Sequence, residues 1–230
     1  QLSFFFGETE KFNLTWQKQG EETRLTPLLF VESETKSSLV PGALQTDMNL
    51  NYRILRSGVD RFEIQVPQGQ EILSVEGENI KEWDVVEMDN HQVLDVSLHS
   101  LARKKYSLRL LVEQALESLP TEISLPQIEA RNVVRQRGSF LIENSPELEV
   151  ATVASSGLTQ QSMISVAAQK KAANALTPYA RFRYLTLPFD LSLSVKKAEP
   201  LIEVESWTRF TVEPDSANFL ARFDYEIKRT

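Results

Sequence analysis

Residues that could do chemistry are few in this chain, and their spacing does not bring them together. The two histidines, His91 and His99, stand at the two ends of one expected strand. Eight residues of extended chain cover about 26 Å, so the two imidazoles cannot bind one metal ion. We interpret both histidines as residues at strand ends and not as metal ligands or catalytic bases.

The sequence also lacks the short motifs that position reactive groups. It has no nucleophile elbow, no phosphate-binding loop, no paired-histidine zinc motif and no dinucleotide-binding motif. Cysteine is absent, which excludes disulfides, thiolate metal sites and a cysteine nucleophile. Glycoside hydrolysis needs two carboxylates across a cleft, but no pair stands out among 32 acidic residues. We therefore predict no catalytic residue, no metal ligand and no cofactor.

The three tryptophans are candidates for ligand contact, because aromatic rings stack on the apolar faces of sugars. They are Trp16, Trp83 and Trp207. The surroundings of Trp83 are typical of a core or rim residue. Trp207 lies outside the alternating apolar positions of its segment, so we expect it to be more exposed than the other two. We take Trp207 as the candidate ligand-binding residue, in contact either with a glycan or with a neighbouring domain.

Charge and hydropathy narrow the range of partners. The net charge is −7, and basic residues form only small clusters. A nucleic-acid-binding protein needs a basic stripe to neutralise phosphates, so we expect no nucleic-acid partner. No apolar run approaches the ~18 residues of a membrane-spanning helix, so we expect no membrane span. We interpret the basic clusters as solvated strand ends; they are Arg103–Lys105, the triplet Arg131, Arg135 and Arg137, Lys170–Lys171 and Lys196–Lys197.

The elements that would position these residues include a repeated segment. Residues 27–57 return without a gap as residues 200–230, at a constant offset of 173. Ten of the 31 aligned residues are identical, among them the pair Tyr52 and Tyr225. Two unrelated segments of average composition would share about two. The sequence therefore predicts an internal duplication.

The second half of each copy alternates between apolar and polar residues. In residues 44–54, leucine, methionine, tyrosine and isoleucine occupy even-numbered positions, and polar residues occupy the odd-numbered ones. Residues 217–227 alternate in the same way, and Leu220 is the one apolar residue among the alternate polar positions. Successive side chains of a strand point to opposite faces, so both segments are predicted to be strands with one buried face. We also expect strand 217–228 to pair inside a larger sheet, because a long open edge strand promotes aggregation.

This repeat sets the expected domain organisation. We interpret residues 1–230 as a single β-sandwich domain or a fragment of one, with one repeat unit at about 27–199 and the start of a second at 200–230. The last strand ends where its counterpart meets Ser57 and Gly58. The parent protein is therefore expected to continue with a turn and a strand similar to residues 59–66.

Turn residues divide the rest of the chain into short alternating runs, as in an all-β protein. Ser57 and Gly58 between two such runs are typical of a hairpin. Residues 159–176 break the pattern, because they contain no Gly or Pro and place apolar residues at helical spacing. We predict a short helix there, with a mobile connector as the alternative. Further strands are expected near 59–66, 71–76, 80–88, 91–98, 105–115, 121–125, 129–143, 147–153, 181–186, 190–196 and 200–206.

Long strands with short links predict an all-β fold, a large antiparallel β-sandwich of the super-sandwich type. The layout resembles that of long bacterial envelope proteins built from β-rich repeats. We therefore expect a non-catalytic structural or interaction module of a larger tandem-repeat protein, in the periplasm or on the cell surface. Its partners would be neighbouring domains of the same chain. The alternative is a carbohydrate-binding or accessory domain of a polysaccharide-active enzyme, and a hydrolase with its site on the sandwich face is a third hypothesis that no residue supports.

Overall fold

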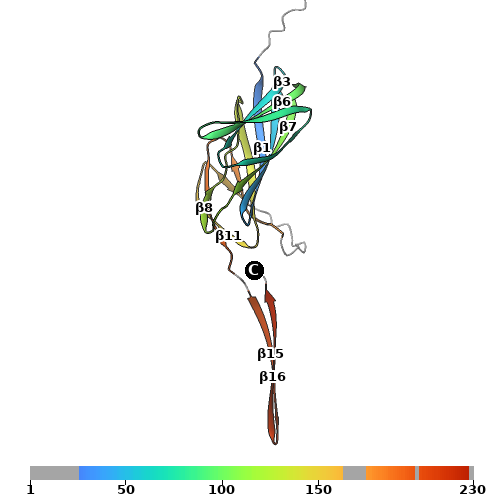
Figure 1. The fold of residues 1–230 in the computed structure, drawn as a ribbon, viewed down its shortest axis with the longest axis vertical. Helices are drawn as coiled ribbons and strands as arrows, with labels where there is room; N and C mark the ends of the chain where they lie inside the picture. Colours follow the sequence, from blue (N-terminus) through green and yellow to red (C-terminus); the bar gives the residue numbers. More distant parts are fainter. Residues whose placement is uncertain (1–25, 163–174, 200–201, 228–230) are drawn as a thin grey trace, which may run out of the picture.

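The computed structural model describes residues 26–162, 175–199 and 202–227, and these residues form sixteen β-strands and no helix. Figure 1 shows a body of packed sheets and a two-stranded hairpin that projects from it along the long axis of the molecule. Nearly all strand pairs are antiparallel. The prediction of an all-β, mostly antiparallel sandwich is therefore confirmed.

The largest sheet has seven strands in the order β12-β13-β10-β1-β2-β7-β4. Its centre is the hairpin of β1 (Leu28–Val40) and β2 (Ala43–Leu55), each 13 residues long. A strand of this length extends about 43 Å. One pair departs from the antiparallel pattern, because β1 and β10 run parallel. The remaining strands of this sheet are β4 (Glu71–Gly77), β7 (Lys105–Ala115), β10 (Arg135–Asn144), β12 (Thr159–Gln161) and β13 (Thr177–Tyr184).

Two smaller sheets cover the inward face of the large sheet, one over each half of β1 and β2. The four-stranded sheet has the order β5-β6-β3-β9, and the three-stranded sheet has the order β11-β14-β8. The strands of the first are β3 (Val59–Pro67), β5 (Ile80–Glu87), β6 (His91–Ala102) and β9 (Glu129–Ala130). Those of the second are β8 (Thr121–Ser124), β11 (Leu148–Ser156) and β14 (Asp190–Lys197).

This arrangement produces two hydrophobic cores. The first joins Leu29 and Val31 of β1 to residues of the four-stranded sheet such as Phe62. The second joins Leu39, near the other end of β1, to residues of the three-stranded sheet such as Leu193. Because β1 and β2 supply side chains to both cores, they tie the two halves into one unit.

Polar side chains occupy the inward face of β1 between the two cores. Ser33 and Ser37 are buried there. The Ser33 hydroxyl is hydrogen-bonded to the Tyr184 hydroxyl of β13, and the Ser37 and Thr46 hydroxyl oxygens are 3.4 Å apart. The inward face of β1 is thus apolar at both ends and polar in the middle.

The helix predicted for residues 159–176 is wrong for the part that the structure describes. Thr159–Gln161 form the short strand β12, which pairs with β13. Gly157, at φ +73°, turns the chain just before β12. Pairing with the edge of the large sheet outweighs local helix propensity here. Residues 163–174 lie outside the described residues.

The hairpin predicted at Ser57 and Gly58 is also wrong, because the strands on its two sides belong to different sheets. Strand β2 pairs with β1 and β7, whereas β3 pairs with β6 and β9. A Cβ on Gly58 would lie 3.0 Å from the Leu101 side chain. The glycine therefore permits a close approach to β6 as the chain crosses from one sheet to the other.

The second copy of the repeat forms the projecting hairpin, with β15 (Ile202–Glu213) and β16 (Ser216–Ile227). Its register equals that of the first copy: Val31 faces Tyr52, and Val204 faces Tyr225. The expectation that residues 217–228 pair inside a larger sheet is wrong, because β15 is the one strand that pairs with β16 among the described residues. The places beside β7 and β10 in the sandwich are already filled by β2 and β1.

Candidate functional site

The described residues bring no metal-binding constellation together. His91 and His99 both lie on β6, as expected from their spacing. Within residues 26–162, 175–199 and 202–227, no group of three or more His, Asp or Glu side chains could hold a metal ion. The surfaces with distinctive chemistry are an apolar face and an acidic face on the hairpin, and a basic hollow on the sandwich.

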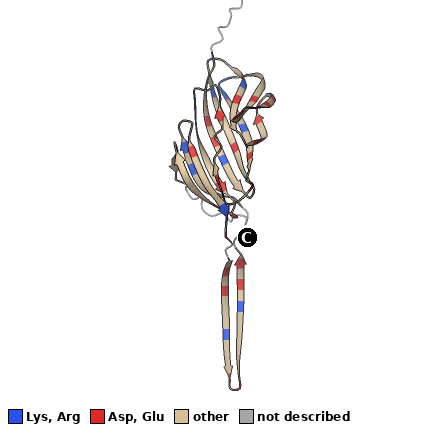
Figure 2. Cartoon of the chain, turned by 60° about the vertical axis from the view of Figure 1, so that its left-hand side comes forward, with Lys and Arg blue, Asp and Glu red and all other residues tan. Residues whose placement is uncertain are grey.

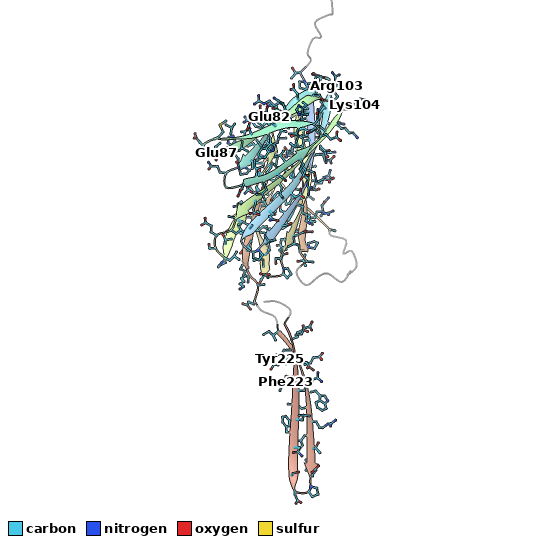
Figure 3. All side chains as sticks on the ribbon, turned by 45° about the vertical axis from the view of Figure 1, so that its right-hand side comes forward. Glu82, Glu87, Arg103, Lys104, Phe223 and Tyr225 are labelled. Carbon is cyan, nitrogen blue, oxygen red and sulfur yellow. The ribbon has the colours of Figure 1, made fainter. Side chains whose placement is uncertain are left out.

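The apolar face of the hairpin is the face whose counterpart in the first copy is buried. Tyr225 is 67% exposed, whereas Tyr52 is 3% exposed. Phe223 is 53% exposed, whereas its counterpart Leu50 is fully buried. Figure 3 shows Phe223 and Tyr225 on the projecting hairpin, beyond the end of the sandwich. The exposed large side chains of this face are Ile202, Val204, Phe210, Val212, Phe219, Phe223 and Tyr225.

The middle of this apolar face has lost a polar pair that the first copy has. The polar pair Ser37 and Thr46 is replaced by Phe210 and Phe219, which lie directly opposite each other. Facing aromatic side chains stabilise a two-stranded ribbon by roughly 0.2–1 kcal/mol. The second hairpin is therefore more apolar on this face than the hairpin that the sandwich buries.

The acidic face of the hairpin is its opposite face, close to the sandwich. Glu203 lies across from Glu226, and Glu205 lies across from Asp224. All four carboxylates are on exposed residues, and the Arg222 guanidinium donates a hydrogen bond of 3.1 Å to Asp224. Figure 2 shows acidic residues on both strands at the hairpin end next to the sandwich. This end of the face carries more carboxylates than guanidinium groups, so a basic surface would be a favourable partner for it.

Trp207 lies on the same face as these carboxylates, and it faces Arg222 across the ribbon. Its side chain is 48% exposed, more than the 38% of Trp83 on the outer strand β5. The Arg209 guanidinium lies 5.1 Å from the centre of the indole ring, a distance at which a cation is attracted to the ring face. Trp207 is thus more exposed than Trp83, as predicted. Its role as a ligand-binding residue stays a prediction. Trp16 lies outside the described residues.

The basic hollow lies on the outward face of the large sheet, at the end where β1 begins. It has a volume of about 620 Å³. The strand register aligns Arg135, Phe30, Arg53 and Lys105 in one row across β10, β1, β2 and β7. The next row holds Arg137, Glu32, Asn51 and Ser107. The hollow is therefore lined by four cations and one carboxylate.

The cations of the hollow are only partly neutralised. The Arg137 guanidinium forms an ion pair of 3.4 Å with Glu32. The Arg53 guanidinium lies 4.9 Å from the centre of the Phe30 ring. Within the part of the chain that the structure describes, Arg53, Lys105 and Arg135 form no salt bridge. This end of the outward face is therefore positive in a chain whose net charge is −7.

Sequence reasoning missed the basic hollow because its residues come from four strands. In the sequence, Arg103–Lys105 and the triplet around Arg135 have the pattern of separate strand ends. Arg53 has the pattern of a polar residue in an alternating strand. The parallel pairing of β10 with β1 brings them together. Figure 3 places Arg103 and Lys104 at the end of the sandwich far from the hairpin. The alternate polar residues of 44–56 indicated that Arg53 faces outward. They could not indicate which strands lie beside it.

An ion pair lies further along the same outward face. The Arg109 guanidinium donates two hydrogen bonds to Asp47, of 2.9 and 2.8 Å, and also approaches Glu76 at 3.4 Å. The hydrogen bond from Arg109 lowers the pKa of the Asp47 carboxyl below its usual range. This part of the face is neutralised by its own residues, unlike the basic hollow.

Beneath the sheet, buried tyrosines differ in how their hydroxyls are satisfied. The Tyr184 hydroxyl bonds to Ser33 and accepts a hydrogen bond of 3.2 Å from the Gln136 amide. The Tyr52 hydroxyl is buried without a hydrogen-bond partner among the described residues. Burial raises the pKa of both phenols, and the charge of Tyr106 adds to the rise for Tyr52.

Comparison with known proteins gives no family for the chain. No family model matches, and no curated protein matches. The M1 zinc metallopeptidase of Deinococcus radiodurans is 12% identical, with a TM-score of 0.41, over 85% of this chain and 47% of that chain. Native yeast LTA4 hydrolase is 8% identical, with a TM-score of 0.44, over 84% of this chain and 31% of that chain. The chain spans half or less of these proteins, and at such identities and TM-scores the likeness assigns neither a family nor an activity.

The described residues contain no helix with the length and apolar character needed to cross a bilayer.

Proposed function

We propose that the chain is a non-catalytic structural and interaction module of a tandem-repeat protein, and that the hairpin of β15 and β16 opens a second sandwich. Residues 27–199 are then one repeat unit, and its partners are the neighbouring units of the same protein. The observation that carries the proposal is a second hairpin with the register of the first and an uncovered apolar face.

The energetics of the hairpin support a covering partner. A two-stranded hairpin is marginally stable in water, and both outer edges of β15 and β16 are open in the described chain. Burial of one large apolar side chain contributes roughly 1.5–3 kcal/mol. Seven such side chains lie on the apolar face, so a partner that buries them would stabilise the hairpin by on the order of 10 kcal/mol. In the first copy, β7 and β10 pair with the strand edges, and the two smaller sheets cover the apolar face.

The test uses a longer piece of the natural protein that adds one further repeat length after residue 230. The added sequence should begin with a turn and a strand similar to residues 59–66. Hydrogen–deuterium exchange is then measured on β15 and β16 in the present chain and in the longer one. We expect protection of both strands to rise to the level of β1 and β2, because the added strands would pair with their open edges.

Exchange of β1 and β2 is the internal control and should be equal in the two chains. A longer chain whose added residues lack the strand pattern would contradict the proposal. Unchanged exchange of β15 and β16 in a folded longer chain would do so as well.

The periplasm or the cell surface is the compartment that we propose for this module, in keeping with its repeat layout. Cell fractionation with an antibody against the sandwich tests this, and a cytosolic protein would contradict it.

A further inference from the structure

We infer that two copies of this chain pair antiparallel, with the basic hollow of each sandwich covering the acidic face of the other copy's hairpin. This contact goes beyond the proposed tandem array and does not rest on it. The acidic face points away from the apolar face, so it stays available whether or not a second sandwich covers the apolar side.

The basic hollow requires an anionic partner of a particular shape. Its cations span four neighbouring strands, about 14 Å at ~4.8 Å per strand. Among residues 26–162, 175–199 and 202–227, Arg53, Lys105 and Arg135 have no carboxylate partner, so their charges can meet an external one. Guanidinium groups bind carboxylates through paired hydrogen bonds.

The acidic face of the hairpin has the matching chemistry. Two facing pairs, Glu203 with Glu226 and Glu205 with Asp224, place four carboxylates on two adjacent strands. Two guanidinium groups, those of Arg222 and Arg209, follow further along the same face, so the end next to the sandwich remains net acidic. Trp207 lies next to the carboxylates on the same face, 48% exposed, and would be covered in the contact. The charges of the two surfaces are thus opposite, which favours association and fixes its register.

The repeat shows that the two surfaces occupy the same place in the two copies of the repeated segment. The offset of 173 aligns Phe30 with Glu203 and Arg53 with Glu226. Phe30 lies opposite Arg53 in the first hairpin, and Glu203 lies opposite Glu226 in the second. The centre of the basic hollow in the first copy therefore corresponds to the acidic face in the second. A carboxylate replaces the Arg53 guanidinium and another replaces the Phe30 ring, so the outward faces of the two copies differ in charge at this place.

The positions of the two surfaces require a second copy. The hollow lies at the start of β1, whereas the hairpin leaves the other end of the sandwich, about one 43 Å strand length away (Figures 1 and 3). A chain cannot bring its own two surfaces together across that distance. When two copies face each other antiparallel, the contact of hollow with hairpin forms twice around one two-fold axis. Closed two-fold dimers are the commonest protein assemblies.

Sedimentation velocity of the whole chain across a range of salt concentrations tests the inference. We expect a dimer at low ionic strength that dissociates at about 1 M salt, where charges are screened beyond about 3 Å. Two charge-reversed chains are compared: the hollow variant carries Arg53→Glu and Lys105→Glu, and the hairpin variant carries Glu205→Lys and Asp224→Lys. Each alone should weaken the dimer at least about tenfold, because each variant places like charges in both contacts.

Mixing the two variants provides the decisive measurement. The acidic hollow of one then meets the basic hairpin of the other, and the unaltered surfaces meet in the second contact, so a heterodimer should form. One chain with all four substitutions should dimerise as well. Trp207 fluorescence, measured against a Trp207→Phe control, should change only in the mixtures and chains that associate.

Three results would overturn the inference. The first is a monomeric natural chain at low salt, and the second is two variants that fail to pair when mixed. The third is association that strengthens with salt and is lost in a Phe219→Ser and Phe223→Ser chain, which would assign it to the apolar face. Retention of polyphosphate by the hollow of a chain that does not dimerise would instead assign the hollow to a free polyanion.

Discussion

At the scale of single residues, two buried tyrosines carry opposite predictions. Tyr52→Phe removes a buried hydroxyl that has no partner in the described part of the chain, so we expect the free energy of unfolding to rise by about 1 kcal/mol. Tyr184→Phe leaves Ser33 and Gln136 without their shared partner, so we expect a loss of about 1–2 kcal/mol. Urea unfolding of both variants beside the natural chain measures the difference. Equal losses in the two variants would show that the Tyr52 hydroxyl is satisfied.

The same pair predicts how stability depends on alkaline pH. Burial raises the pKa of the Tyr52 phenol in the folded chain, so the unfolded chain releases its proton first, at about pH 10. The stability that Tyr52 contributes is therefore complete below about pH 10 and decreases as the pH rises further. Tyr52→Phe should remove part of this decrease. An unchanged slope of unfolding free energy against pH would contradict the assignment.

The sequence predicted which residues of β2 point inward, because burial follows the alternation of residues 44–54. It could not predict which buried hydroxyls find partners. The bond between Ser33 and Tyr184 joins residues 151 positions apart, and no local pattern marks it. The row of Arg135, Arg53 and Lys105 escaped prediction for the same reason.

At the scale of elements, the parallel contact of β1 and β10 depends on Gly138. Gly138 lies opposite Ser33, and a Cβ there would collide with the Ser33 side chain and carbonyl oxygen. We therefore expect Gly138→Ala to lower the free energy of unfolding by about 1–3 kcal/mol. Ser139→Ala, the next residue of the same strand, should change it by less than about 0.5 kcal/mol. Thermal unfolding of the two variants measures the contrast, and an unaffected Gly138→Ala chain would show that β1 and β10 can separate without cost.

Elements were predicted better than their partners. Alternation and turn residues located most strands, since both signals are local, but the central strand β1 was not among those predicted. Pairing is set by distant contacts, so the crossing at Ser57 and Gly58 was interpreted as a hairpin and the parallel neighbour of β1 was not foreseen. The strand at Thr159–Gln161 shows the same limit, because the edge of β13 decides its conformation.

At the scale of the whole molecule, the two copies of the repeat differ in what covers them, and equivalent substitutions should reveal it. Leu50→Ala opens a cavity in the first core, so we expect the free energy of unfolding to fall by about 2–5 kcal/mol. Phe223→Ala, at the equivalent position, should change it by less than about 0.5 kcal/mol, because that ring is 53% exposed. Urea unfolding of both variants, followed by circular dichroism, tests this contrast. A large loss of unfolding free energy in Phe223→Ala would mean that the hairpin packs against the sandwich. The apolar face would then not be open to bind a further unit. The expected result is that Phe223→Ala is as stable as the natural chain, whereas Leu50→Ala is destabilised. The sandwich is then stable without the hairpin, and the hairpin is the element that joins it to the next unit.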